Sequence, residues 1–264
     1  MLTIIVVHYN APCALRDCLN ALKNANLEIP MELIIIDNAS AHSPRPLIEF
    51  FNKFFEILFI ENRINLGYAR AVNQGLKKAR GEFILIINPD ILIPAGAIEE
   101  MVKYLEREPE VGLLAPALFY PDGSVQRSCF RWPRFYTPFV RRTFLKCTPW
   151  GKRELERYLM VHFECDRIEK VDWVLGAAMM VKKSAIRKVG LMDERFFLYF
   201  EDVDWCRRFA KQNLRVVYFP RARFLHKYAR ISAQGGGLWM IFNKYFWLHT
   251  ISYLRYFIKW HICC

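Results

Sequence analysis

The sequence predicts an α/β fold in which a mostly parallel central sheet carries helices on both faces. Apolar runs rich in β-branched residues occupy residues 2–7, 33–36, 55–60 and 83–87, and helical patterns separate them. Strands that are apolar along their whole length are typical of parallel sheets covered on both sides. With 264 residues, 53% of them hydrophobic, the chain can bury a core of this size.

The first half of the chain is expected to alternate strand and helix. Leu15, Leu19 and Leu22 recur on one face after the first strand, which predicts an amphipathic helix. Helices are expected over residues 12–24, 69–79 and 94–107. The first apolar run is too short for a signal peptide and no basic residues precede it, so it indicates a buried strand.

The second half is less regular. Residues 116–150 are rich in Pro, aromatic residues and Arg, which predicts extended and partly exposed structure. An apolar run at 171–181 indicates a strand with a bend at Gly176 and Ala177. Short helices are expected over 183–189 and 202–212, and a late strand over 214–218.

Basic residues are concentrated in two segments of a chain whose net charge is +12. Nine Lys and Arg lie between Arg127 and Arg157 against two Glu, and eleven follow Trp205 with no acid. Basic surfaces of this kind suit an anionic partner, such as phospholipid, diphosphate or nucleic acid.

The last segment, residues 238–264, is expected to form an amphipathic helix. Asn243, Lys244, His249, Arg255 and Lys259 interrupt it, so it is a poor transmembrane candidate. On a helical wheel Lys244, Arg255 and Lys259 share one side, and the other side carries Phe246, Trp247, Leu254, Phe257 and Ile258. This pattern favours a helix lying in a membrane interface. The alternative is a helix packed on the body with a basic outer face.

The eight cysteines contain no C-x-x-C pair and no metal-ligand spacing, which argues against a zinc site or a disulfide framework. Reduced thiols in a cytosolic protein are the simpler expectation. The terminal pair Cys263 and Cys264 has no role that the pattern indicates.

Polar residues follow the predicted strands directly. They are His8, Tyr9 and Asn10; Asp37 and Asn38; residues 62–67; and Asn88, Pro89 and Asp90. Ligands of open α/β sheets bind beyond the carboxyl ends of the strands, so these residues are expected to line one mouth. The chain has no G-x-G-x-x-G or Walker pattern, which argues against a dinucleotide dehydrogenase and a P-loop enzyme.

An aromatic approach at residues 196–200 leads into three carboxylates, Glu201, Asp202 and Asp204, and basic residues follow at once. One interpretation is a catalytic site. The other is a helix start, because acids in a first turn complement the helix dipole.

Five motifs in this order resemble the family-two glycosyltransferases, and most closely a rhamnosyltransferase-like branch that builds bacterial O-antigen and other surface polysaccharides. The motifs lie at residues 37–40, 62–75, 88–90, 172–177 and 200–204. The resemblance covers roughly residues 2–230. It implies a GT-A fold, a nucleotide-diphosphate sugar donor, a divalent cation and an inverting displacement.

For the donor, the resemblance implies contacts from the residues at the strand ends. Asp37 matches a residue that contacts the nucleoside, and Asp90 matches the metal-binding aspartate, with Mg²⁺ or Mn²⁺ as the expected cofactor. His226 matches a late histidine that reaches the metal or the diphosphate. The expected donor-binding set is His8, Tyr9, Asn10, Asp37, Asn65, Gly67, Asn73, Asn88 and Asp90. Many relatives carry two acids in the third motif, whereas Asn88 takes the first place here.

For catalysis, the resemblance assigns the general base to Asp202, with Glu201 as its competitor and Asp204 as a helix cap. An inverting transfer needs one such base to take the proton of the acceptor hydroxyl. Asp172, Trp173 and Gly176 are expected near the donor sugar or the acceptor, where Trp173 offers a flat apolar face to a sugar ring.

The expected function is therefore transfer of a sugar, with L-rhamnose from dTDP-rhamnose as the leading candidate, to a polyprenyl-diphosphate-linked saccharide. Alternatives are a UDP-hexose transferase of the same family, or a non-enzymatic protein that binds nucleotide sugar or nucleic acid. Nucleic acid is not the expected partner, because it leaves the polar strand ends unexplained. The protein is expected in the cytoplasm, peripheral on the inner face of the cell membrane.

Three regions are expected along the chain. Residues 1–115 form the nucleotide-sugar-binding half of one domain, residues 116–237 the acceptor-binding and catalytic half, and residues 238–264 the membrane-interface tail.

Overall fold

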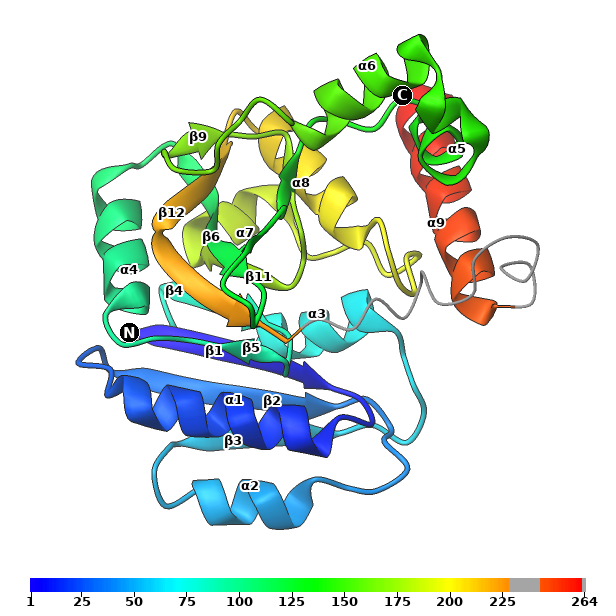
Figure 1. The fold of residues 1–264 in the computed structure, drawn as a ribbon. Coiled ribbons are helices and arrows are strands. Elements are labelled where there is room, and N and C mark those ends of the chain that lie inside the picture. The colour runs from blue at the N-terminus through cyan, green and yellow to red at the C-terminus, as the bar shows by residue number, and fades with distance from the viewer. Residues whose placement is uncertain (228–242, 263–264) are drawn as a thin grey trace.

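A computed structural model describes residues 1–227 and 243–262, and Figure 1 shows its arrangement. The four predicted strands of the first half pair in parallel, in the order β3-β2-β1-β4. Their bounds are β1 (Leu2–His8), β2 (Met31–Asp37), β3 (Ile57–Glu61) and β4 (Phe83–Ile87). The predicted parallel half of the sheet is confirmed.

The sheet continues beyond β4 as a mixed one. The strand β11 (Ala178–Lys182) runs antiparallel to both β4 and β6 (Val111–Phe119), and β12 (Arg215–His226) runs parallel to β6. Short strands complete the sheets: β5 (Ile91–Leu92), β7 (Val125–Gln126), β8 (Cys129–Phe130), β9 (Glu169–Lys170) and β10 (Trp173–Val174). Of these, β8 and β10 form a separate two-stranded sheet.

Helices cover both faces because successive strand residues point to opposite sides. On β1, Leu2, Ile4 and Val6 pack with α1, α2 and α4, whereas Ile5 and Val7 pack on the side of α3, α7 and α8. The first group is α1 (Pro12–Ala25), α2 (Arg45–Phe51) and α4 (Ala97–Arg107). The second is α3 (Tyr68–Lys78), α7 (Lys183–Val189) and α8 (Glu201–Lys211).

The extended structure expected over residues 116–150 is found up to residue 136 and is wrong for residues 137–150. After β6 to β8 the chain forms α5 (Thr137–Arg142), the 3₁₀ helix η1 (Phe144–Cys147) and α6 (Pro149–Leu159). Thr148 caps α6, since its side chain accepts a hydrogen bond from the Gly151 N–H. These helices stand apart from the sheet, beside α9 (Figure 1).

The C-terminal helix α9 (Lys244–His261) packs on the body, which was the alternative expectation for the tail. Tyr253, Tyr256, Phe257 and Trp260 are buried, and Lys259 pairs with carboxylates of the body. The predicted wheel, with Phe257 on a lipid-facing side and Lys259 facing water, is therefore wrong at both residues. The start of the expected tail at Leu238 and the pair Cys263 and Cys264 lie outside the described residues. Among the helices described, none is long and apolar enough to span a bilayer.

Candidate active site

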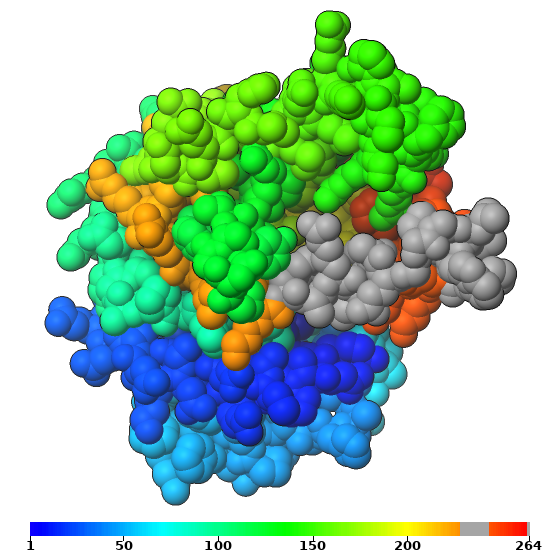
Figure 2. Space-filling model, in the orientation of Figure 1, coloured from blue at the N-terminus to red at the C-terminus, as the bar shows by residue number. Residues whose placement is uncertain are grey.

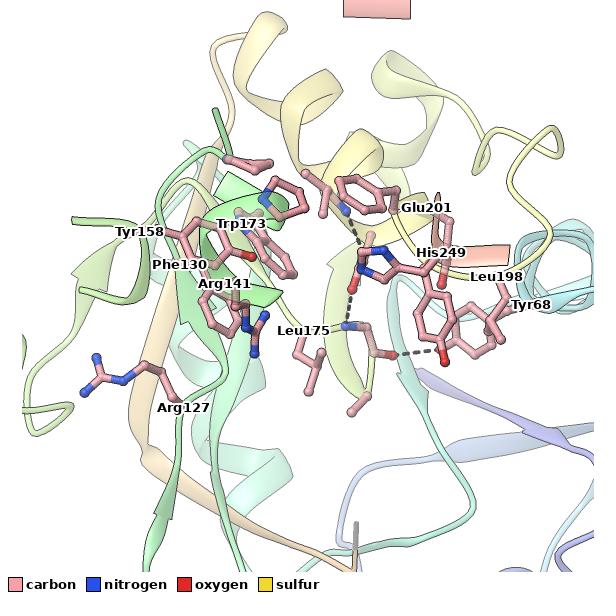
Figure 3. A pocket seen from close by; sticks show the side chains of 18 of the residues that line it. Tyr68, Arg127, Phe130, Arg141, Tyr158, Trp173, Leu175, Leu198, Glu201 and His249 are labelled. Atoms are coloured by element: carbon pink, nitrogen blue, oxygen red, sulfur yellow. Dashed lines mark hydrogen bonds between the residues drawn. The ribbon is translucent and has the colours of Figure 1, made fainter. Parts of the chain in front are cut away.

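A cavity of about 520 Å³ opens between the sheet, the N-terminal end of α8 and the pair α5 and α9. Figure 3 shows its aromatic wall of Phe130, Tyr158 and Trp173 on one side, with His249 and Tyr68 on the other. Of the predicted site residues, those that line it are Asn88, Trp173, Gly176, Glu201, Asp202 and His226. The structure thus brings together predictions from four separate parts of the sequence.

Asp202 lies at this cavity with a fixed orientation. Its Oδ2 accepts a hydrogen bond of 2.9 Å from the Gly176 N–H, and its Oδ1 accepts one of 2.8 Å from the Val203 N–H. A Cβ atom at position 176 would lie 3.3 Å from the Asp202 Cβ, so glycine permits the close approach. The Tyr68 hydroxyl donates to the Gly176 carbonyl at 2.7 Å and completes the support.

Burial separates the two neighbouring carboxyls chemically. Burial and the adjacent Asp202 charge raise the pKa of Glu201 well above its usual range. Burial also raises the pKa of Asp202, to about 6, while the N–H groups of Gly176 and Val203 oppose the rise. Asp202, whose ionised form accepts two backbone N–H bonds, is therefore better suited than Glu201 to act as a base.

The backbone before α8 is strained. Tyr199 and Phe200 have positive φ values of 70° and 67°, a region that costs a non-glycine residue about 1–2 kcal/mol. This turn aims Glu201 and Asp202 at the cavity. The predicted capping role of Asp204 is wrong: Asp204 lies inside α8, fully buried, and binds Arg208, Lys259 and Trp260.

Asp90 and His226 meet near the end of β12, although they are far apart in the sequence. The His226 Nε2 lies 3.3 Å from the Asp90 Oδ2, and its Nδ1 lies 2.7 Å from the Gln126 Oε1. When the ring donates from Nδ1 to Gln126, its Nε2 directs a lone pair at a carboxylate oxygen. Two acceptors that face each other in this way fit a divalent cation between them. The described residues hold no cluster of three or more such ligands, so the donor phosphates would have to complete the shell.

His8 and Asp37 form a buried pair at the ends of β1 and β2. The His8 Nδ1 lies 2.7 Å from the Asp37 Oδ1, and the Ser40 hydroxyl donates to the same oxygen at 2.6 Å. The Ala11 N–H donates to the His8 Nε2. These bonds use the polar atoms of both side chains, so in the structure His8 and Asp37 hold the ends of β1 and β2 together. The predicted contacts of these two residues with the donor stay predictions.

Tyr9 and Asn10 follow this pair and are exposed. Asn10 has a φ of 51° and accepts a hydrogen bond of 2.8 Å from the Ala41 N–H. The two loops after β1 and β2 are thereby tied together, and Tyr9 remains accessible beside them. Their predicted role in donor binding also stays a prediction.

The loop before α3 rests on side-chain amides. The Asn38 Nδ2 donates to the Asn65 Oδ1 at 2.9 Å, and this oxygen also accepts the Gly67 N–H at 2.9 Å. Gly67 has a φ of 81°, and a Cβ there would lie 2.4 Å from the Phe197 carbonyl oxygen. Glycine is required on both counts, and it joins this loop to the turn that precedes Glu201.

Two other predicted residues lie away from the cavity lining. Asn73 is buried, and its amide binds the Met192 backbone and the Glu194 carboxylate. Asp172 accepts a hydrogen bond of 2.7 Å from the Trp132 N–H. In the structure both residues hold neighbouring loops in place.

Trp173 lines the cavity, but one of its ring faces is covered. Phe130 stacks on it with a centroid distance of 4.4 Å and an interplanar angle of 20°. The Trp173 Nε1 donates to the Arg131 carbonyl at 3.1 Å. Only the remaining face can meet a sugar ring.

The cavity is also lined by residues that were not predicted as site residues: Tyr68, which lies within the second motif, and Gln126, Arg127, Phe130, Arg141, Arg142, Tyr158 and His249. The charge pattern offered a partial signal, because three of these are Arg from the first basic segment. For His249 no signal existed, since its contribution depends on how α9 packs.

Two sequence profiles match the chain. Glycosyl transferase family 2 matches residues 3–150, and Glycosyl transferase family group 2 matches residues 83–259. The chain belongs to glycosyl transferase family 2. The first match covers the loops after β1, β2 and β4, and the second covers the acidic turn before α8.

Curated relatives of this family 2 glycosyltransferase include rhamnosyltransferases. The N-acetylglucosaminyl-diphospho-decaprenol L-rhamnosyltransferase of Mycobacterium tuberculosis is 29% identical over 245 residues, covering 86% of this chain and 76% of the relative. The rhamnosyltransferase WbbL of Escherichia coli K12 is 26% identical over 199 residues, covering 75% of this chain and 69% of the relative.

Solved structures share the fold. The mannosyltransferase PcManGT of Pyrobaculum calidifontis, in complex with GDP-Man and Mn²⁺, matches with a TM-score of 0.62 and 18% identity, over 98% of this chain and 64% of its own. GalNAc-T7 with UDP, GalNAc and Mn²⁺ matches with a TM-score of 0.66 and 14% identity, over 98% of this chain and 48% of its own. These neighbours identify the fold as GT-A-like, and the chain spans only part of their length.

Proposed function

We propose that this glycosyltransferase transfers a sugar with inversion from a nucleotide-diphosphate donor to a polyprenyl-diphosphate-linked saccharide, in the synthesis of O-antigen or another surface polysaccharide. The leading donor is dTDP-rhamnose, because rhamnosyltransferases from two organisms are similar to the chain over most of its length. A UDP-hexose is the second candidate, since a solved neighbour of the same fold holds UDP.

The observation that carries the proposal is the oriented carboxylate of Asp202 at the cavity. Two backbone N–H groups orient it, whereas burial and the Asp202 charge raise the pKa of the neighbouring Glu201. An inverting transfer needs one base on the face of the sugar opposite the leaving group. A second ionised carboxylate close by would favour a different chemistry, with a covalent sugar intermediate.

The proposed step follows from this geometry. The oxygen of the acceptor hydroxyl attacks the anomeric carbon of the donor sugar and forms the new glycosidic bond. The Asp202 carboxylate takes the hydroxyl proton. The bond between the anomeric carbon and the phosphate oxygen breaks, and its electron pair leaves with the nucleoside diphosphate.

Asp90 and His226 are the residues that would hold a divalent cation, Mg²⁺ or Mn²⁺. Such a cation neutralises negative charge on the leaving diphosphate. Gln126 keeps the His226 ring in the orientation that faces Asp90, through the 2.7 Å contact at Nδ1. Asn88 lines the cavity on the same loop as Asp90. These side chains belong to the donor end of the cavity in our proposal.

The acceptor is proposed to approach from a membrane surface, on the cytoplasmic side of the cell membrane. The side of α9 away from the body is apolar, and the neighbouring helices α5 and α6 carry basic residues. Anionic phospholipids attract such basic surfaces.

The first test is a donor panel measured by calorimetry with Mn²⁺. The panel contains dTDP-rhamnose, UDP-glucose, UDP-galactose, UDP-N-acetylglucosamine and GDP-mannose. We expect one donor to bind in a metal-dependent manner, and Asp90→Ala to abolish the dependence on metal. If single-stranded nucleic acid binds and no donor does, the protein is a binding protein rather than the proposed enzyme.

The second test isolates the base. Asp202→Asn should retain donor binding and lose transfer by about a hundredfold to ten-thousandfold. The matched variant Glu201→Gln keeps the neutral form that the structure favours, and it should retain most activity. Loss of activity in Glu201→Gln with activity retained in Asp202→Asn would exchange the two roles.

A further inference from the structure

One corner of the cavity, formed by α5 and α9, is strongly basic. Arg141 and Arg142 end α5, and His249 faces them from α9 across the cavity lining. The two helices are packed together there: Phe139 contacts Tyr253 edge-on at 5.9 Å between ring centroids, and Arg142 lies 5.4 Å from the centre of the Phe246 ring. The corner therefore brings together residues more than a hundred positions apart in the sequence.

No carboxylate neutralises this corner among the residues that the structure describes. Neither Arg141 nor Arg142 forms an ion pair with a described residue, whereas Arg134 and Arg157 of the same region both pair with Glu154. Burial and the Arg141 charge lower the pKa of Arg142. Burial and both arginines lower the pKa of His249 to about 3, so its ring is neutral. Arg142 is half-buried and Arg141 is exposed beside it, and a half-buried cation without a carboxylate partner indicates a site for an anion.

The corner lies next to an exposed apolar surface. Trp247, Ile251, Leu254 and Ile258 occur at helical spacing along α9, and each has more than two fifths of its surface exposed. Phe139 adds an exposed aromatic ring from α5. An anion bound here would have its remaining atoms beside apolar side chains. A nucleotide has no apolar part of this kind, but a lipid-linked phosphate has one.

In the proposed function the donor diphosphate binds at a different end of the cavity. Asp90 and His226 face each other at the end of β12, beside Gln126. The charges that shift the pKa values of His249 and Arg142 come from neighbouring arginines and Tyr199, and Asp90 is not among them. Two anion-binding ends of one cavity are what a transfer between two diphosphate-bearing substrates requires.

We infer that Arg141 and Arg142 of α5, with His249 of α9, form a second anion subsite that holds the phosphate groups of the lipid-linked acceptor. This inference rests on the proposed function and adds the residues that recognise the acceptor. Arginine suits the task because its planar guanidinium binds phosphate oxygens in pairs. The helix α9 is then part of the active site as well as part of the packing.

The direct test is binding of geranyl diphosphate, a short lipid diphosphate, with the donor site first saturated by nucleotide. We expect the wild-type protein to bind it, and Arg141→Gln/Arg142→Gln to bind it about tenfold or more weakly. The double variant should bind nucleotide with unchanged affinity. The matched control Lys146→Gln/Lys152→Gln removes the same charge from exposed positions of the neighbouring helices, and it should leave both affinities unchanged.

Geraniol and inorganic diphosphate identify the source of the affinity. Binding of inorganic diphosphate as tight as that of geranyl diphosphate would show a free-phosphate site and overturn the assignment to lipid. Geraniol binding as tightly as the diphosphate would overturn the role of the arginines. A parallel loss of nucleotide affinity in Arg141→Gln/Arg142→Gln would assign these residues to the donor instead.

Two further measurements separate this inference from the proposed function and from misfolding. Arg141→Lys/Arg142→Lys retains the charge without the planar fork, so it should bind the diphosphate with intermediate affinity if the fold is intact. A wild-type protein that binds neither nucleotide nor geranyl diphosphate would refute both proposals. One that binds nucleotide but no lipid diphosphate would refute only the subsite.

Discussion

At the residue scale, the two adjacent carboxyls Glu201 and Asp202 have different chemistry because their contacts differ. Asp202 accepts two backbone N–H bonds, which stabilise its ionised form against the cost of burial. The Glu201 Oε2 is buried without a hydrogen-bond partner. A buried carboxyl in that position is more stable with its proton. The resemblance assigned the base to Asp202 with Glu201 as its competitor, and these contacts give a physical reason for that preference.

The pH dependence of the reaction should report Asp202. Its pKa is raised to about 6. The Asp202 charge in turn raises the pKa of four neighbouring groups: Glu201, Tyr68, Tyr158 and Cys206. Because the base must be ionised, kcat/KM should be constant above this pKa and fall about tenfold per pH unit below it. Initial rates between pH 5 and pH 8, at saturating metal, give the profile. A rate that rises toward low pH would contradict the assignment.

Glu201 should make the protein less stable as the pH rises. Its pKa is raised in the folded state, so the unfolded chain loses the proton first, and the free energy of unfolding falls as the pH rises above the usual glutamate pKa. Glu201→Gln should therefore raise the melting temperature at pH 8, with a gain that shrinks toward pH 5.

Glu154→Gln is a control for which the opposite change in melting temperature is expected. Although burial opposes the shift, bonds from Arg157 and Thr137 lower the pKa of Glu154. Removal of the Glu154 carboxylate should therefore destabilise the protein at pH 8. Equal responses of the two variants would refute this account.

At the element scale, periodicity predicted the strands and helices of the first half because each lies in a regular two-faced environment. The helix expected over 69–79 is α3 at Tyr68–Lys78, and the strand at 83–87 is β4. The segment 116–150 resisted prediction because its helices are short. Helix α5 has only six residues, and tertiary contacts with α9 hold it rather than a periodic apolar face. Short helices gain most of their stability from such contacts.

The contact between α9 and α8 should matter for both stability and catalysis. The Trp260 Nε1 donates a 2.8 Å hydrogen bond to the Asp204 Oδ1, two residues beyond the proposed base. Trp260→Phe should cost about 1–3 kcal/mol of unfolding free energy, because it leaves a buried carboxylate with one donor fewer. It should also lower kcat through the position of α8, while donor affinity stays unchanged.

The same substitution at an exposed site of the same helix provides the control. Trp247 is 52% exposed, and Trp247→Phe should change the unfolding free energy by less than about 0.5 kcal/mol. Denaturant unfolding and steady-state rates measure both variants. If the two substitutions cost the same, the bond to Asp204 contributes nothing specific.

At the scale of the whole molecule, the cavity is assembled from parts that the sequence separates. The pairing of β12 with β5 brings His226 to Asp90. The packing of α9 on α5 brings His249 to Arg141. The motifs marked the donor side because strand ends gather at one edge of a parallel sheet. No comparable rule exists for the acceptor side, so its residues became visible only in the structure.

The surface shared by α5, α6 and α9 should bind anionic membranes. The space-filling view shows the green segment of residues 137–159 projecting beside the red α9 (Figure 2). Exposed Phe144 and Trp150 on that segment accompany the apolar positions of α9, and Lys146, Lys152 and Arg153 supply the charge. Apolar side chains enter the interface, and basic residues are attracted to anionic headgroups.

Cosedimentation with vesicles tests this surface directly. We expect binding to vesicles that contain phosphatidylglycerol, weaker binding at high salt, and little binding to neutral vesicles. Trp247→Gln/Leu254→Gln should release the protein while nucleotide affinity stays unchanged. Phe50→Gln/Leu58→Gln removes comparably exposed apolar side chains from α2 and from β3 at the edge of the sheet, away from α9, and should have no effect. Because a lipid-linked acceptor remains in the bilayer, the release variant should lose transfer to vesicle-bound acceptor and keep transfer to a short, water-soluble one. Equal loss with both acceptors would show that these residues act inside the cavity rather than at the membrane.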